Sequence, residues 1–100
     1  MKVNICGLLH EVIEVSDNFT ADSTHLGEIT YKDLEIKINK DMPNEARDET
    51  ICHEMLHGML VHLGYAELSQ DEQFVQALGN AIYQGFSIKG YESKERVDEP

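Results

Sequence analysis

Five consecutive residues near the middle of the chain, His53-Glu54-Met55-Leu56-His57, have the types and spacing of a metal site that activates water. On a helix, histidines four residues apart lie one turn apart on the same face, so both imidazoles can reach one metal ion. A glutamate directly after the first histidine is turned by about 100° from it, which places a base beside the metal. Neutral imidazoles suit Zn²⁺, which lowers the pKa of a bound water to about 7. We therefore expect one Zn²⁺ ion, with Glu54 as the general base.

The helix expected around this motif favours a metal site over two surface histidines that share a helix by chance. Glycine and proline are absent from Glu45 to Leu63 except for Gly58. His53 and His57 fall at the border of an apolar arc, which consists of Cys52, Met55, Leu56, Met59, Leu60 and Leu63. Such an arc anchors a helix to the core while residues at its border point into a sheltered cleft.

The histidines outside the motif are poor candidates for a third ligand. His62 stands nine residues after the first histidine of the motif, on the opposite side of the helix. Gly58 directly follows the motif, so the longer pattern with a third histidine is absent. His10 and His25 lie outside the expected helices, and nothing in the sequence directs them to the site.

Two acidic residues that open the second expected helix are better candidates. This helix must pack back on the first after a short turn, so its first turn can approach the metal. Asp71 and Glu72 both stand there. Each also has a structural interpretation: Asp71 as a favourable charge at a helix N-terminus, and Glu72 as the capping-box partner of Ser69. Spacing alone leaves both candidates open.

Other side chains near these elements have both a chemical and a structural interpretation. Three tyrosines could each donate a hydrogen bond from the hydroxyl to a developing oxyanion: Tyr31, Tyr65 and Tyr83. Such tyrosines are more often aromatic residues of the core or its rim. Cys52 falls on the apolar arc, so we expect a small buried side chain.

The first half of the chain predicts strands. Apolar and β-branched residues cluster from Val3 to Val15, with Gly7 as a bend or bulge. Residues 16–25 are polar and typical of a loop. Residues 27–39 contain two short runs with period-two alternation, joined by a hairpin turn at Lys32-Asp33. The expected sheet is small and antiparallel, with about three strands.

The second half predicts two helices. Asn44 is a suitable N-cap for the motif helix, and Gly64 stands where a C-cap glycine belongs. A second helix is expected from Ser69 to about Phe86. We thus expect one α+β domain over residues 1–90, in which the sheet packs against the motif helix and a second long helix. We expect residues 91–100 to form a charged, flexible tail.

The sequence resembles the ImmA/IrrE-like group of small zinc metallopeptidases, most of all the very short versions encoded by phages and prophages. The resemblance covers about residues 25–86. It rests on Gly27-Glu28-Ile29-Thr30-Tyr31, Leu34-Glu35-Ile36-Lys37-Ile38, Arg47 and Thr50-Ile51-Cys52-His53-Glu54-Met55-Leu56-His57. The group's later pattern, Glu-x-x-Ala-Asn-x-Phe-Ala, falls on Glu72-Gln73-Phe74-Val75-Gln76-Ala77-Leu78-Gly79, with Val75 and Gln76 in place of Ala-Asn.

The resemblance implies a minimal zincin-like fold and a zinc metallopeptidase in which His53, His57 and Glu72 hold the metal. Glu54 would activate water for attack on a peptide carbonyl. A peptide substrate would add as a strand beside Leu34–Ile38 or Gly27–Tyr31. A different class of function is a non-catalytic, metal-stabilised module that binds a basic protein partner. A third is a metal-dependent hydrolase that acts on something other than peptide, such as RNA.

Composition restricts these alternatives. Eight Lys and Arg stand against nineteen Asp and Glu, which gives a net charge of −11. This charge disfavours binding to nucleic acid or to an anionic membrane surface. Only Cys6 and Cys52 are present, and we expect no disulfide between them. No signal peptide and no apolar run long enough to cross a bilayer stand in the sequence, so we expect a cytoplasmic protein.

Overall fold

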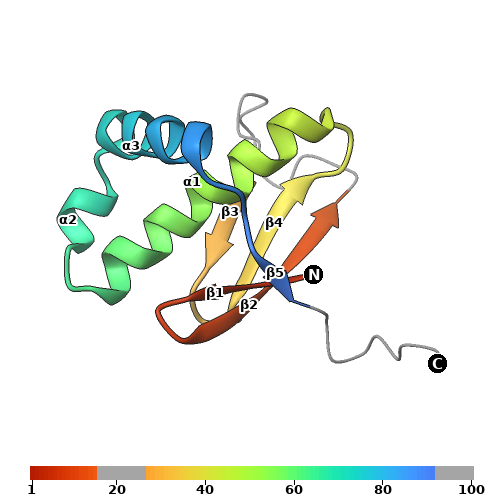
Figure 1. The fold of residues 1–100 in the computed structure, drawn as a ribbon. Helices are drawn as coiled ribbons and strands as arrows, with labels where there is room; N and C mark the ends of the chain where they lie inside the picture. Colours follow the sequence, from red (N-terminus) through yellow and green to blue (C-terminus); the bar gives the residue numbers. More distant parts are fainter. Residues whose placement is uncertain (16–26, 92–100) are drawn as a thin grey trace.

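The computed structural model describes residues 1–15 and 27–91, and within them the fold is α+β (Figure 1). The strands are β1 (Lys2–Ile5), β2 (Leu8–Val15), β3 (Gly27–Thr30), β4 (Glu35–Asn39) and β5 (Gly90–Tyr91). The helices are α1 (Asn44–His62), α2 (Ala66–Ser69) and α3 (Glu72–Gly85). Helix α1 packs on one face of the sheet, and α2 and α3 pack on α1 (Figure 1). The motif helix therefore lies between the sheet and the other helices.

The sheet is mixed, with the strand order β3-β4-β2-β1-β5. The hairpins β1–β2 and β3–β4 are antiparallel, as expected, whereas β2 and β4 pair in parallel, with Val12 opposite Ile36. The expectation of a purely antiparallel sheet of about three strands is therefore wrong. Alternation marks a half-buried strand but does not specify its neighbour or direction. The loop expected at residues 16–25 lies outside the described residues.

Both turns of the hairpins lie where the sequence placed a break. Cys6 and Gly7 join β1 to β2 with φ values of 52° and 92°, the conformation of a type I′ two-residue turn. Lys32 and Asp33 lie in the turn between β3 and β4, which confirms the predicted hairpin. Tyr91 was expected in the tail, but it pairs with Lys2 as the end of β5, and residues 92–100 lie outside the described residues.

The core forms where alternate residues of the sheet meet α1. Its buried side chains are Val3, Ile5, Val12, Ile36, Ile38 and Ile51. Gly58 brings α1 close to the sheet, because a Cβ there would lie 3.0 Å from Ile29 and 3.1 Å from Ile5. The glycine that follows the motif thus has a packing role. It seats the motif helix directly on strands β1 and β3.

Of the two predicted ends of α1, the C-terminal one is confirmed and the N-terminal one is wrong. Asn44 is the first helical residue rather than the N-cap, because Pro43 occupies the capping position and its carbonyl accepts the Arg47 N–H at 2.9 Å. At the other end, Gly64 has a φ of 95° and directly follows the C-cap residue, as predicted. The Tyr65 N–H donates to the Leu60 carbonyl at 2.7 Å, the long bond of a Schellman motif.

The buried residues of α1 cover more of the helix circumference than the single apolar arc that the sequence suggested. The buried residues are Ile51, Cys52, Glu54, Leu56 and Gly58. Two faces are covered because α1 contacts the sheet on one side and α3 on the other. Leu63, expected at the end of the arc, is 64% exposed. The described helices include none with the length and apolar character of a bilayer span.

Candidate metal centre

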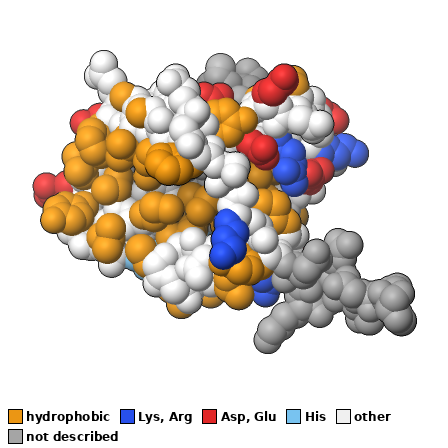
Figure 2. Space-filling view, in the orientation of Figure 1, with side chains coloured by type: hydrophobic (Ala, Val, Ile, Leu, Met, Phe, Trp, Pro, Cys, Tyr) orange, Lys and Arg blue, Asp and Glu red, His pale blue; other side chains and the backbone are white. Residues whose placement is uncertain are grey.

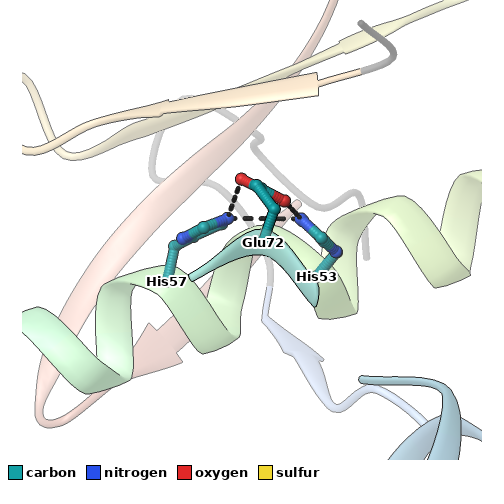
Figure 3. A group of neighbouring side chains, drawn as sticks. All are labelled: His53, His57 and Glu72. Atoms are coloured by element: carbon teal, nitrogen blue, oxygen red, sulfur yellow. Dashed lines mark hydrogen bonds and ion pairs between the residues drawn. The ribbon is translucent and has the colours of Figure 1, made fainter. Parts of the chain in front are cut away.

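Three side chains from two helices converge on one point (Figure 3). His53 and His57 come from α1, and Glu72 comes from the first turn of α3. The Nε2 atoms of His53 and His57 lie 3.0 Å from the two carboxylate oxygens of Glu72 and 3.2 Å from each other. Both histidine side chains are largely buried, with exposed fractions of 17% and 13%, whereas that of Glu72 is 69% exposed. The carboxylate thus closes the open side of the histidine pair.

The spacing of these atoms fits a metal ion. Ligand atoms about 2.1 Å from a tetrahedral ion lie about 3.4 Å from one another. The two Nε2 atoms lie 3.2 Å apart, and each lies 3.0 Å from a different carboxylate oxygen of Glu72. One donor atom from each of the three residues lies within 4.8 Å of the others. Two imidazoles and one carboxylate are also a donor set that leaves the fourth position open. The group could therefore hold a metal ion with little rearrangement.

Asp71 and Glu72, which spacing left open as alternatives, have different roles. The Asp71 carboxylate caps α3 by accepting the Phe74 N–H at 3.1 Å. This is the structural interpretation of Asp71, and it is confirmed. Glu72 is the residue that joins His53 and His57. Because α3 begins at Glu72, the capping box expected from Ser69 does not form.

Ser69 instead contacts His57, one of the three residues that could hold a metal ion. The sequence did not indicate this role. The Ser69 hydroxyl lies 3.1 Å from Nδ1 of His57 and 3.2 Å from the backbone carbonyl of the same residue. The hydroxyl donates to the carbonyl and can accept a hydrogen bond from an Nδ1–H of His57. In that tautomer of His57, Nε2, which faces Glu72 and His53, is the ring nitrogen that can bind a metal. Ser69 is 5% exposed because the short helix α2 folds it against α1. A partner of this kind fixes the ring and tautomer of a metal ligand.

Glu54 shares a cleft with His57 and Glu72. The cleft encloses about 460 Å³ and is lined by Glu28, Ile29, Tyr31, Glu54, His57, Val61, Ala66, Ser69, Gln70 and Glu72. Glu54 is 7% exposed, and burial raises the pKa of its carboxyl to about 7, with smaller contributions from the charges of Glu72 and Glu28. A carboxyl with a pKa near neutrality can both accept and return a proton.

One of the three candidate tyrosines lies at the cleft. Tyr31 lines it from the turn after β3. Burial raises the pKa of its phenol, and a hydrogen bond with Ser69 opposes this shift. Tyr65 and Tyr83 are not among the residues that line the cleft. Cys52 is buried as expected, with Sγ 4.0 Å from the carbonyl oxygen of Gly79 in α3.

The remaining histidines lie elsewhere, as far as the described residues extend. His10 is buried in β2, where its Nδ1 lies 3.0 Å from the Leu8 carbonyl oxygen, and its ring meets that of His62 edge-on at 6.0 Å. His62 also contacts the ring of Tyr31 at 6.2 Å. These contacts agree with a structural role for both. His25 lies outside the described residues.

Comparisons with protein-family models, with curated proteins and with solved structures each find no match.

Proposed function

We propose that this protein is a zinc-dependent metallopeptidase of the ImmA/IrrE-like, zincin-like type. The observation that carries the proposal is the convergence of His53, His57 and Glu72, with Glu54 in a cleft that His57 and Glu72 also line. The sequence motif accounts for three of these residues. The fourth, Glu72, comes from α3, and the resemblance implies a glutamate ligand from a helix after the motif. The α+β arrangement, with the motif helix packed on a sheet, also supports this class.

The proposed chemistry assigns a separate task to each residue. The Nε2 atoms of His53 and His57 and one carboxylate oxygen of Glu72 would hold Zn²⁺, which supplies a Lewis acid and lowers the pKa of a coordinated water. Glu54 would accept the proton of the attacking water and deliver it to the leaving amine. Tyr31, which lines the cleft, would donate a hydrogen bond from its hydroxyl to the developing oxyanion. Ser69 would hold the His57 ring in the tautomer that leaves Nε2 free.

The substrate in this proposal is a peptide bound along β3. In the described part of the sheet, β3 pairs with β4 alone, whereas β4 lies between β3 and β2. Of the two segments expected to add a peptide strand, only Gly27–Thr30 is therefore at an edge. Glu28 and Ile29 of this strand also line the cleft. The carboxylate of Glu28, which has no task at the metal, would favour a basic side chain near the cleaved bond.

The alternative is a metal-stabilised binding module without turnover. A metal held by His53, His57 and Glu72 would cross-link α1 to α3 and stabilise the fold whether or not a reaction follows. This alternative therefore predicts zinc binding and stabilisation of the fold with no hydrolysis. The charge of −11 weighs against a polyanionic substrate such as RNA in either case.

One experiment separates these proposals. The full chain would be stripped with a chelator, reloaded with one equivalent of Zn²⁺, and incubated with a diverse peptide library read by mass spectrometry. A peptidase cleaves a subset of peptides, with basic residues enriched near the cut. Glu54→Gln should keep the zinc, measured by elemental analysis, and lose at least about 10²-fold in rate. Zinc binding by the wild type without any cleavage would favour the module, and full activity of Glu54→Gln would refute the assigned base.

A further inference from the structure

The cleft beside the metal group (His53, His57 and Glu72) extends along α1 in both directions from His57. Glu54 and Val61 both line it, and they are seven residues apart on this helix. Seven residues bring a helix back to within about 20° of its starting direction and advance it by about 10 Å. Both side chains therefore point to the same side of α1, with His57 between them. The cleft thus has one end at Glu54 and another at Val61.

Strand β3 runs beside this side of α1 in the same direction. At its start, a Cβ at Gly27 would lie 3.5 Å from Cγ of Glu54. Just beyond its end, the ring of Tyr31 meets that of His62 edge-on at 6.2 Å. Glu28 directly follows Gly27, and its charge contributes to the raised pKa of Glu54. Glu28 therefore belongs to the Glu54 end of the cleft, whereas Tyr31 belongs to the opposite end.

Helix α2 completes the second end of the cleft. The Tyr65 N–H donates to the Leu60 carbonyl at 2.7 Å, so Ala66, the first residue of α2, lies beside the last turn of α1. Ala66 lines the cleft together with Tyr31 and Val61. We call these three residues the Val61 pocket.

The two ends of the cleft differ in charge. The acidic residues that line the cleft in the described part of the chain all lie at the Glu54 end or in the metal group: Glu28, Glu54 and Glu72. Figure 2 shows hydrophobic side chains gathered over α2, α3 and the C-terminal part of α1, with charged groups at the margin. A charged side chain that entered the Val61 pocket would lose water without gaining an ion partner. An apolar side chain would be stabilised by leaving water.

We propose that the Val61 pocket is a specificity site that receives a medium-sized aliphatic side chain of the substrate, such as that of leucine. This proposal rests on the proposed function, because it concerns the substrate of the same metal centre. Val61 and Ala66 have short side chains and come from two different helices, so space remains between them for a branched aliphatic group. Burial of such a group favours leucine over glycine by about 10-fold.

The position of the pocket defines where this side chain stands in the substrate. Val61 lies one helical turn beyond His57, which is about 6 Å along α1. An extended peptide advances by about 3.4 Å per residue. The aliphatic side chain therefore belongs to a residue next to the cleaved bond or one residue further along. The basic residue that Glu28 favours is a different residue of the substrate, toward the Glu54 end.

Binding of amino-acid hydroxamates to the zinc-loaded full chain tests the pocket without requiring turnover. A hydroxamate chelates zinc, so leucine and glycine hydroxamates differ only in the side chain that they offer to the cleft. Leucine hydroxamate should bind about 10-fold more tightly than glycine hydroxamate, measured by isothermal titration calorimetry. Val61→Lys should remove this preference and bind the α-hydroxamate of glutamic acid more tightly than the wild type does. Leu63→Lys, at a residue that is 64% exposed and does not line the cleft, should behave as the wild type.

A steric variant covers the case in which Val61→Lys does not fold. Ala66→Phe, at an exposed residue of α2, should fill the pocket, so that leucine hydroxamate binds no more tightly than glycine hydroxamate. Equal affinities of the wild type for the two hydroxamates overturn the proposal. An undiminished preference for leucine in a folded Val61→Lys or Ala66→Phe variant also overturns it.

Peptide cleavage separates failure of the pocket from failure of the proposed function. With a peptide library, the wild type should enrich leucine or a similar residue at one position near the cut, and Ala66→Phe should shift that position to glycine or alanine. Cleavage without this enrichment overturns the specificity site and leaves the peptidase intact. A leucine preference in hydroxamate binding without any cleavage supports the pocket and refutes the peptidase. A chain that binds no zinc refutes both.

Discussion

The two sides of helix α3 differ in nearly every physical property. On one side Glu72 reaches two histidines of α1, next to a cleft that also contains Glu28 and Glu54. On the other side the chain presents Phe74 and small residues without charge. One helix of fourteen residues therefore carries a side with a candidate metal ligand and an apolar side. The comparison teaches that a metal-binding side chain and an apolar surface can be separated on a small domain by rotation around a single helix axis.

The largest expected effect is on zinc affinity, which should depend on Glu72 on one side of α3 and not on residues of its other side. Zinc sites bind with about 10–16 kcal/mol shared among their ligands, so removal of one of three ligands costs about 4 kcal/mol. Glu72→Ala should therefore weaken zinc binding by about 10³-fold, measured by competition with a chromophoric chelator. Ala81→Glu, on the other side of α3, should leave the affinity unchanged. Equal affinities for Glu72→Ala and the wild type would show that the third donor lies elsewhere.

A second effect concerns the buried carboxyl on the cleft side. The pKa of Glu54 is raised from 4.5 in the unfolded chain to about 7 in the folded, metal-free protein. The folded state therefore binds the proton more tightly, and its stability falls as the pH rises from about 4.5 through about 7. The resulting loss in the free energy of unfolding is on the order of 3 kcal/mol. A cation bound beside the carboxylate would reduce this loss.

Urea unfolding of the chelator-treated protein at pH 5 and pH 8 would measure this effect. The wild type should lose more stability between these two pH values than Glu54→Gln, which has no proton to release. The apolar face of α3 should contribute nothing to the difference, so Phe74→Ala should follow the wild type. Identical pH dependence in the wild type and Glu54→Gln would contradict the raised pKa.

The smallest effect concerns Ser69. Loss of an outer hydrogen-bond partner costs about 10-fold or more in metal affinity. Ser69→Ala should therefore bind zinc about 10-fold more weakly, and Ser69→Thr should restore part of the loss if the cleft accommodates the extra methyl group. Ser87→Ala, at an exposed serine beyond α3, is the matched control. A ring resonance of His57 that keeps the same tautomer in Ser69→Ala would show that the hydroxyl does not position it.

Local patterns predicted much of the fold. The two hairpin turns, the C-terminal end of α1 and the burial of Cys52 follow from short stretches of chain, and the structure agrees with each. The parallel pairing of β2 with β4 was not predictable in this way, because it depends on which strands meet after a connection of eleven residues between Val15 and Gly27. The role of Ser69 was missed for a related reason. Ser69 contacts His57, which lies twelve residues earlier in the chain and on a different helix.

The sequence by itself determined the position of His53, Glu54 and His57 relative to one another, because the helical repeat places them on neighbouring faces of one helix. It also determined the excess of acidic residues and the uncharged stretch at residues 73–88, which covers α3 after Glu72. Only the tertiary structure decided between Asp71 and Glu72, and it placed β3 rather than β4 at the edge beside the cleft. Periodicity fixes geometry within an element, whereas contacts between elements depend on how their side chains pack together in space.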